Sequence, residues 1–328
     1  MCIRDRRRIE SSIAVPNGWN RVSGPEGNRL LPELPQELPD VAIVIPTRDR
    51  LDLLERCVES LRNVTRYPAL EICVADNDSV EPETKSYFAL MRSRGESVVH
   101  CPGAFNFSAI VNRAVANTRS DYVLLLNNDI EIIDPDWLHE MVAHVLRAEI
   151  GCVGAKLFYP DGRVQHAGVT IGLGNLAGHT MRFYPGDSPG YLNRLEMTQS
   201  YRAVTAACLL VRRDVYQEVG GFNETDLAVA YNDIDFCLRV EQAGYRNLWT
   251  PHARLVHHEY ASRGLDTDAA KKARYARECD YFQKAWHSQL HVDPYYHRLL
   301  TRQDESCSLT ASPSVRRPWM VMASEGAL

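Results

Sequence analysis

Apolar runs and helical repeats alternate along the central part of this chain. Short runs of aliphatic and β-branched residues are typical of buried strands, whereas apolar residues that recur every three or four positions are typical of helices. Strands are predicted at Val41–Pro46, Leu70–Ala75, Tyr122–Leu126 and Cys152–Phe158. Helices are predicted at Leu51–Asn63, Glu83–Arg94, Ala109–Thr118 (capped by Ser108) and Pro135–Arg147. This alternation predicts an α/β fold in which helices cover both faces of a mostly parallel sheet.

The pattern changes after Pro160. Residues 161–202 are rich in glycine, aromatic and turn-forming residues and show no helical repeat. Further strands are predicted at Ala203–Val211, Tyr245–Trp249 and Ala253–His257, and further helices at Val229–Ala243 and Asp268–His287. We therefore expect one α/β domain at 39–264, followed by a helical extension at 265–300.

The two ends of the chain differ from this domain in composition. Residues 1–38 are rich in proline and glycine, which predicts an arm or linker. Within them, Met1–Arg6 has the look of a translated sequencing adapter, so the native chain is expected to continue upstream. Residues 301–328 are rich in serine and are predicted to be a disordered tail.

Composition narrows the class of protein. The chain has 328 residues, of which 45% are hydrophobic and 24% charged, with a formal net charge of -5, so it is not typical of a dedicated nucleic-acid binder. Its nine cysteines form no CxxC pair and several lie in apolar runs, which favours small core residues in a reducing compartment over a zinc site. No membrane-spanning run or secretion signal is visible, so a cytoplasmic protein is expected.

Polar residues follow two of the predicted strands near the start of the domain. Pro46, Thr47 and Arg48 end the first strand just before a helix, a position that suits a phosphate group. Asp76 follows the second strand, where a carboxylate can bind a ribose hydroxyl or a base edge. Ordinary turns are the alternative for both, because Asp, Asn and Ser also favour turns.

Asn127, Asn128 and Asp129 follow the third strand. Magnesium is often held by one or two carboxylates together with substrate phosphates, so Asp129 is a candidate metal ligand. A helix cap is the alternative, although Asp134 is better placed for that task.

Two later segments carry further candidates. Asp233 lies at a predicted helix start, where it is suited to act as a general base, with helix capping as the alternative. His257 or His258 could ligate a metal, or both could be ordinary surface histidines. The glycines of 172–178 resemble a dinucleotide fingerprint, but they do not follow the first strand, and we expect a loop near an acceptor site instead.

The ordered set of motifs resembles the family 2 glycosyltransferases of the GT-A fold. The set is IPTRDR, DND, LLLNND, VGAKLFYPDG, QHAG, a GGF turn, NDIDFCLR, AGYR and HHEYASRG, within roughly Pro39–Gly264. The resemblance is strongest to rhamnosyl- or O-antigen-type transferases of bacterial surface polysaccharides.

The resemblance implies a role for each matching residue. It implies nucleotide-sugar binding by Pro46, Thr47, Arg48, Asp76, Asn127 and Asn128. It implies that Asp129 binds Mg²⁺ or Mn²⁺ with His257 or His258, with His257 favoured by its spacing from the base, Asp233. It implies an acceptor side formed by Asn232, Asp235 and His166. Two residues depart from the pattern, because the family's DxD reads Asn127-Asn128-Asp129 and Asn232 replaces an acidic residue.

The implied activity is an inverting transfer of a sugar, with rhamnose from a dTDP donor as the first guess, to a glycan or lipid-linked glycan hydroxyl. Such an acceptor would place the enzyme at the inner face of the membrane. Three alternatives remain: a nucleotidyltransferase, a nicotinamide oxidoreductase and a non-catalytic sugar or nucleotide binder on the same fold. The thinned metal motif supports the last of these.

Overall fold

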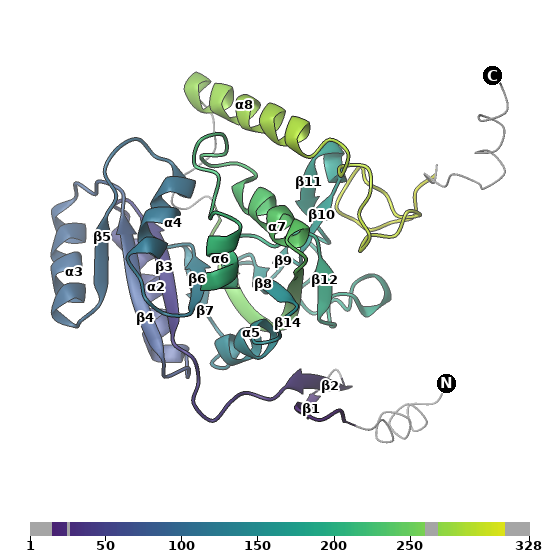
Figure 1. Ribbon diagram of the computed structural model, residues 1–328, viewed down its shortest axis with the longest axis horizontal. Helices are drawn as coiled ribbons and strands as arrows, with labels where there is room; N and C mark the ends of the chain where they lie inside the picture. Colours follow the sequence, from purple (N-terminus) through teal and green to yellow (C-terminus); the bar gives the residue numbers. More distant parts are fainter. Residues whose placement is uncertain (1–14, 25–26, 260–267, 312–328) are drawn as a thin grey trace.

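The computed structural model describes residues 15–24, 27–259 and 268–311. Its first half alternates strands and helices (Figure 1). The elements are β3 (Val41–Thr47), α2 (Leu51–Val64), β4 (Leu70–Asp76), α3 (Pro82–Ser93), β5 (Ser97–His100), α4 (Phe107–Ala116) and β6 (Tyr122–Leu126).

The second half is more varied. Its strands are β7 (Ile130–Ile132), β8 (Ile150–Phe158), β9 (Val164–His166), β10 (Val169–Ile171), β11 (Ala177–His179), β12 (Gln199–Tyr201), β13 (Cys208–Arg212) and β14 (Arg246–His257). Its helices are α5 (Trp137–Val145), α6 (Arg213–Glu218), α7 (Asn232–Gln242) and α8 (Ala269–Ala285), with short 3-10 turns at Leu173–Asn175 and Tyr191–Asn193.

These strands build a ten-stranded sheet in the order β12-β14-β8-β13-β6-β3-β4-β5, with β7 paired to β14 and β9 to β8. β3 runs parallel to β4 and β6, β4 to β5, and β14 to β8. β13 runs antiparallel between β6 and β8. The prediction of an α/β fold is confirmed. The sheet is mixed, because β3 to β6, β8 and β14 share one direction, whereas β7, β9, β12 and β13 run antiparallel to their neighbours.

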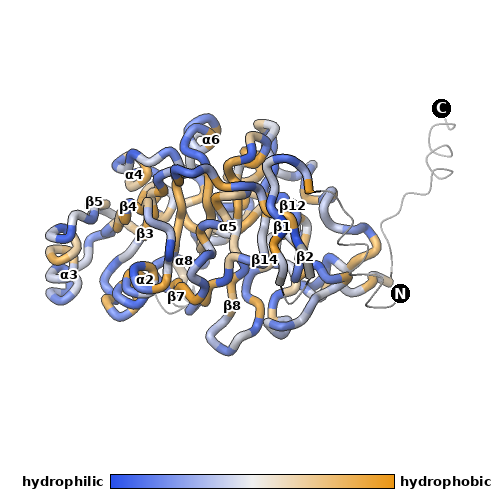
Figure 2. Tube along the Cα trace, turned by 90° about the horizontal axis from the view of Figure 1, so that it is seen from below, coloured by the Kyte–Doolittle hydropathy of each residue, from blue (hydrophilic) through white to orange (hydrophobic). Residues whose placement is uncertain are grey.

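Two hydrophobic cores lie on the two faces of the sheet. Ile43 and Ile45 of β3 point into the core that α2, α3 and α5 cover, whereas Val44 points into the core that α4 and α7 cover. Successive residues of a strand face opposite sides, so a wholly apolar strand needs helices on both. Figure 2 shows the resulting layering, with hydrophobic strands between helices whose outer faces are hydrophilic.

Several predicted elements differ from those in the structure, and local features of the chain explain why. β5 and β7 were missed because they have four and three residues, too few for a periodic pattern. The two strands predicted at Tyr245–Trp249 and Ala253–His257 are one strand, β14, whose register against β8 shifts between Trp249 and Arg254, around Pro251. Asn106, not Ser108, caps α4, because its side chain accepts the N–H of Ala109.

The predicted N-terminal arm is partly a folded element. β1 (Trp19–Gly24) and β2 (Gly27–Pro32) form an antiparallel hairpin, which Figure 1 shows below α5. Arg29 donates a hydrogen bond of 2.6 Å to the buried carboxylate of Glu140 on α5. The adapter-like residues Met1–Arg6 lie outside the described residues. The division into separate domains stays a prediction.

The predicted disordered tail is ordered at its start. Residues 301–311 pack against the β10–β11 region, where Gly174 and Met181 donate backbone hydrogen bonds to Arg302 and Glu305. Cys307 is buried there. The remaining residues, 312–328, lie outside the described part of the chain. None of the described helices is both long and apolar enough to cross a membrane.

The Glu140 cluster makes a prediction about stability. Burial disfavours the charged carboxylate, but hydrogen bonds and charges from His144 and Arg29 outweigh it and lower the pKa of Glu140 from 4.5 to about 2. The charged form therefore stabilises the fold above pH 4.5, and this contribution is lost as pH falls toward 2. Glu140→Gln should lower the free energy of unfolding at pH 7 by on the order of 2–3 kcal/mol in urea titrations.

The exposed Glu83 of α3 supplies the matched control, Glu83→Gln, which should leave stability nearly unchanged. The difference between Glu140→Gln and wild type should shrink below pH 4.5. A difference that stays constant down to pH 3 would contradict the assignment.

Candidate active site

A cavity of about 520 Å³ opens at the carboxyl ends of β3, β4, β6 and β14. This is the edge at which ligands bind in open α/β sheets. It brings together predicted site residues that are more than 200 positions apart in the chain, namely Pro46, Thr47, Arg48, Asn127, Asn128, Asp129, Asn232, Asp233 and His257.

The pairing of β14 with β7 separates the two candidate histidines. His257 lies opposite Ile130 in this antiparallel ladder, and the N–H of His258 donates to the carbonyl of Asp129. Because neighbouring strand residues point to opposite sides, one histidine faces the cavity and the other does not. The Nε2 atom of His257 lies 3.2 Å from Oδ1 of Asp129. His258 instead contacts Glu131, at 2.8 Å.

Asp129 and His257 are suited to hold a divalent cation. A carboxylate oxygen and an imidazole nitrogen, both largely buried, meet at the wall of the cavity. Within the described residues, no cluster of three or more histidine, cysteine or acidic side chains could hold a metal ion. A bound phosphate and water could supply the remaining ligands of a cation here.

Asp233 also lines the cavity and is held at the start of α7. Its Oδ2 accepts the N–H of Ala206, at 3.0 Å, and its Oδ1 accepts the N–H of Ile234, at 2.9 Å. Burial raises the pKa of Asp233 above 3.8, although hydrogen bonds from Ala206 and Thr205 offset part of this effect. A carboxylate whose pKa burial raises is a stronger base than an ordinary aspartate.

Asn232 supports Asp233 from the preceding position. Its Oδ1 accepts the N–H of Asp233, and its Nδ2 donates to Oγ of Ser108 on α4. The side chain is buried, so its contact with the cavity is small. Asn232 therefore links α4 to the first turn of α7.

The loops after β3 and β4 are tied to each other. Asp49 accepts the N–H groups of Val80 and Glu81, and its own N–H donates to Ser79. Thr47 accepts a hydrogen bond from Asn128, which joins the ends of β3 and β6. These contacts give this part of the cavity wall a fixed shape.

Asn77, which the sequence analysis missed, lines the cavity where Asp76 was expected. Its Nδ2 donates to the carbonyls of Cys101 and Gly103, which fixes the orientation of the amide. Its Oδ1 is buried and has no hydrogen-bond partner within the described chain. Asp76 lies at the same strand end, but its Oδ1 accepts the N–H of Ser79.

Glu259 and Lys271 also line the cavity and were not predicted. Arg182 donates to Glu259 at 3.0 Å, and Gln165 donates to it at 3.3 Å. The glycine-rich stretch at 161–202 thus reaches the cavity through Glu259. No signal in the sequence alone brings these segments together.

The structure places two predicted acceptor-side residues outside the lining of the cavity. Asp235 is buried, and Arg239 and Trp286 occupy its two oxygens. His166 is fully buried in β9 against His179, with 2.8 Å between their Nδ1 atoms. Burial lowers the pKa of His166 and keeps the ring neutral. Neither residue lines the cavity.

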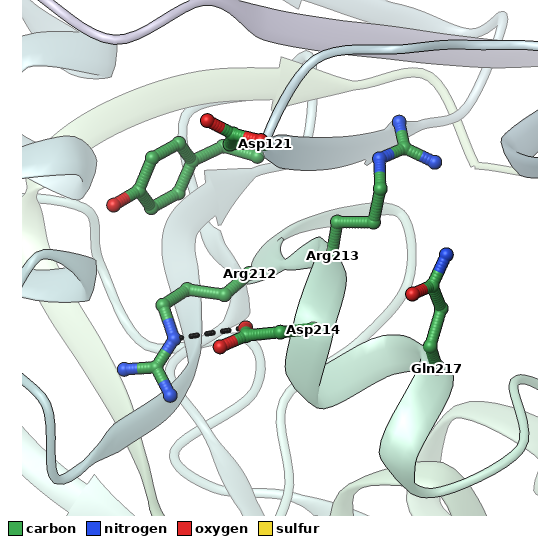
Figure 3. A pocket seen from close by; sticks show the side chains of 6 residues that line it. Asp121, Arg212, Arg213, Asp214 and Gln217 are labelled. Carbon is green, nitrogen blue, oxygen red and sulfur yellow. Dashed lines mark hydrogen bonds and ion pairs between the residues drawn. The ribbon is translucent and has the colours of Figure 1, made fainter.

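A second hollow, of about 330 Å³, lies at the other end of β6 (Figure 3). Its arginines are engaged by the protein itself. Arg213 donates to the carbonyls of Ser120 and Val115, and Arg212 pairs with Asp214 at 3.1 Å. We therefore assign it a structural role.

The model of glycosyl transferase family 2 matches residues 42–220 of the chain. Asp129 lies inside this match, whereas Asp233 and His257 lie beyond it. The uncharacterized protein y4gI of Sinorhizobium fredii is 48% identical over 296 residues, which cover 89% of this chain and 33% of that protein. The O-antigen biosynthesis protein RfbC of Myxococcus xanthus is 38% identical over 283 residues, which cover 84% of this chain and 21% of that protein. The chain thus spans a third or less of the length of these relatives.

A solved structure shares the fold. The mannosyltransferase PcManGT from Pyrobaculum calidifontis, in complex with GDP-Man and Mn²⁺, superposes with a TM-score of 0.56 at 14% identity. The superposition covers 87% of this chain and 74% of that one. The predicted GT-A fold is confirmed.

The separation of the histidines predicts different effects on metal binding. His257→Ala should weaken Mn²⁺ binding at least about tenfold, since even second-shell changes cost about 10–100-fold. Asp129→Asn should do the same, and binding can be followed by the electron paramagnetic resonance of free Mn²⁺. His258→Ala is the matched control and should leave the affinity unchanged. Equal losses from the two histidine variants would refute the assignment of His257.

Proposed function

Because the chain belongs to glycosyl transferase family 2, we propose that its cavity binds a nucleoside-diphosphate sugar and that the protein transfers the sugar to an acceptor hydroxyl. One observation carries the proposal. Asp233, a carboxylate of raised pKa, lines the same cavity as the Asp129–His257 pair. A base for the acceptor and a site for the diphosphate are therefore present together.

The donor lies in this proposal along the ends of β3, β4 and β6. Arg48 and Lys271 are the basic residues among the described lining and would contact the diphosphate. Asn77 lines this part of the cavity and would lie beside the base, with Asp76 near the ribose. Pro46, Thr47, Asn127 and Asn128 would shape the wall around the nucleotide.

Asp129 and His257 would hold the cation in the proposed complex. When bound, Mg²⁺ or Mn²⁺ neutralises charge on a leaving diphosphate by Lewis-acid assistance. With one carboxylate in place of the two of a DxD motif, the protein alone holds the cation weakly. Metal and donor should therefore bind cooperatively.

Asp233 acts in this proposal as the general base. Its carboxylate takes the proton from the acceptor hydroxyl while the hydroxyl oxygen forms a bond to the anomeric carbon. The bond between that carbon and the diphosphate oxygen breaks, and the electron pair leaves with the diphosphate. A single displacement of this kind inverts the anomeric configuration.

The substrates rest on the sequence motifs and on the relatives. We propose rhamnose as the sugar to test first, and a glycan or lipid-linked glycan of a surface polysaccharide as the acceptor. The relative RfbC acts in O-antigen biosynthesis by its name, which supports this choice. A lipid-linked acceptor would place the enzyme at the inner face of the membrane.

A donor screen tests the proposed activity. Purified protein is incubated with a panel of nucleotide sugars and Mn²⁺ or Mg²⁺, and release of the nucleoside diphosphate is measured with and without a chelator. We expect release from one donor that the chelator abolishes. Binding of a donor without release, even with glycan acceptors added, would favour a non-catalytic binder. Absence of any donor binding would refute the proposal.

Replacement of Asp233 should separate catalysis from binding. Asp233→Asn keeps the size of the side chain but removes the base, so turnover should fall about 10²–10⁴-fold while the donor Kd stays within about twofold. Steady-state kinetics and calorimetric titration of the donor measure the two effects.

The pH profile gives a second readout of Asp233. Turnover should fall at low pH as Asp233 becomes protonated. Because burial raises the pKa of Asp233, this fall should begin at a higher pH than the ordinary aspartate pKa of 3.8 would give. Asp134, which is half-buried on the loop before α5 and does not line the cavity, supplies the control Asp134→Asn, which should leave the profile unchanged. An unchanged rate in Asp233→Asn would mean that another group is the base.

A further inference from the structure

Helix α8 carries a buried carboxylate that the proposed reaction does not use. Glu278 is 2% exposed, and its Oε1 and Oε2 accept the N–H groups of Val229 and Ala230, each at 3.0 Å. Burial of a charged group is costly unless it is hydrogen-bonded, and carboxylate–amide bonds are among the strong ones. Glu278 therefore fixes the backbone at 229–230 firmly.

This backbone leads directly into the first turn of α7. Val229 itself lines the cavity, and Ala230 precedes Asp233 by three residues. Between them, Tyr231 has a φ of 60°, a left-handed conformation that is costly for a non-glycine residue. The ring of Tyr231 stacks on Phe282 of α8, with centroids 4.9 Å apart. Contacts with α8 thus offset the strain at the turn that aims Asp233.

The segment after α8 holds the other side of the same turn. The indole N–H of Trp286 donates to Oδ1 of Asp235, at 3.0 Å, and both groups are buried. Asp235 also pairs with Arg239 along α7. The start of α7 is therefore held by Glu278 before Asp233 and by Trp286 after it, and Figure 1 shows α8 running along this side of the molecule.

We propose that Glu278 is a positioning residue for catalysis, and that α8 sets the place of Asp233 relative to the donor. This inference rests on the proposed function of Asp233. Glu278 does not line the cavity, so it acts through the backbone at 229–230. Glu278 on the helical extension then contributes to the position of Asp233.

Glu278→Gln tests this role, because an amide oxygen can accept one of the two N–H groups while its own NH₂ repels the other. We expect kcat to fall about 10–100-fold, as for a displacement near 1 Å, with the KM of the donor within about twofold. The acid limb of the pH profile should move to lower pH, because a looser turn admits water to Asp233. Hydrogen exchange of residues 227–233 should accelerate.

Two further variants serve as controls for Glu278→Gln. Glu278→Asp keeps two acceptor oxygens and should recover part of the lost kcat. Asp280→Asn removes an exposed carboxylate of the same helix, which pairs with Lys284, and should change none of the readouts. Thermal unfolding of each variant shows that the fold is retained.

An unchanged kcat and exchange rate in folded Glu278→Gln would overturn the proposal, as would equal losses in Asp280→Asn. If Glu278→Gln fails to fold, Trp286→Phe tests the same inference. This change removes the hydrogen bond to Asp235 and keeps an aromatic ring at the position. Unaltered kcat and exchange in that variant would also overturn the inference. Hydrogen exchange can be measured without turnover, so it tests the role of Glu278 on its own. Absence of transferase activity in the wild-type protein would refute the proposed function, which is a separate outcome.

Discussion

The register between β14 and β7 is the constraint on which the cavity depends. In this ladder His257 lies opposite Ile130, which brings its imidazole beside Asp129. Slippage by one residue would turn every side chain of the strand to the other side and exchange His257 for His258. β13 adds a second constraint, because it runs opposite to β6 and so begins where β6 ends. The segment that leads into β13 thereby places the N–H of Ala206 against Asp233.

Asp233 and Asp235 show how closely a proposed catalytic residue and a structural residue can lie together. They are two residues apart on α7, which separates them by about 200° around the helix axis. Asp233 therefore faces the cavity, whereas Asp235 faces Trp286 and Arg239. Replacement of Asp233 would remove the proposed base, whereas replacement of Asp235 would disturb the packing around it. Both changes could lower activity, so kinetic constants are needed to tell the two causes apart.

Much of the architecture follows from local sequence signals, and much of the site does not. The apolar runs of β3, β4 and β6 predicted their strands, and polar residues at the ends of β3 and β6 predicted where the cavity lies. Asn77 and Asp76 are adjacent turn-forming residues, so only the fixed orientation of the loop shows which one lines the cavity. The role of Asp235 depends on Trp286, which follows it by 51 residues, and no local pattern records such a contact.

The order of strands in the sheet differs from their order in the chain, and this affects synthesis of the protein. β3 to β6 come from residues 41–126 and pair with one another in parallel, so they can associate early. The partner of β6 on its other side, β13, begins at residue 208. At about 5–20 residues per second, the 81 residues from 127 to 207 take on the order of ten seconds to emerge from a ribosome. During that time β6 is an open, fully apolar sheet edge, the kind of surface that aggregates. Association at this unpaired edge is therefore a hazard that the topology creates until β13 has been synthesised.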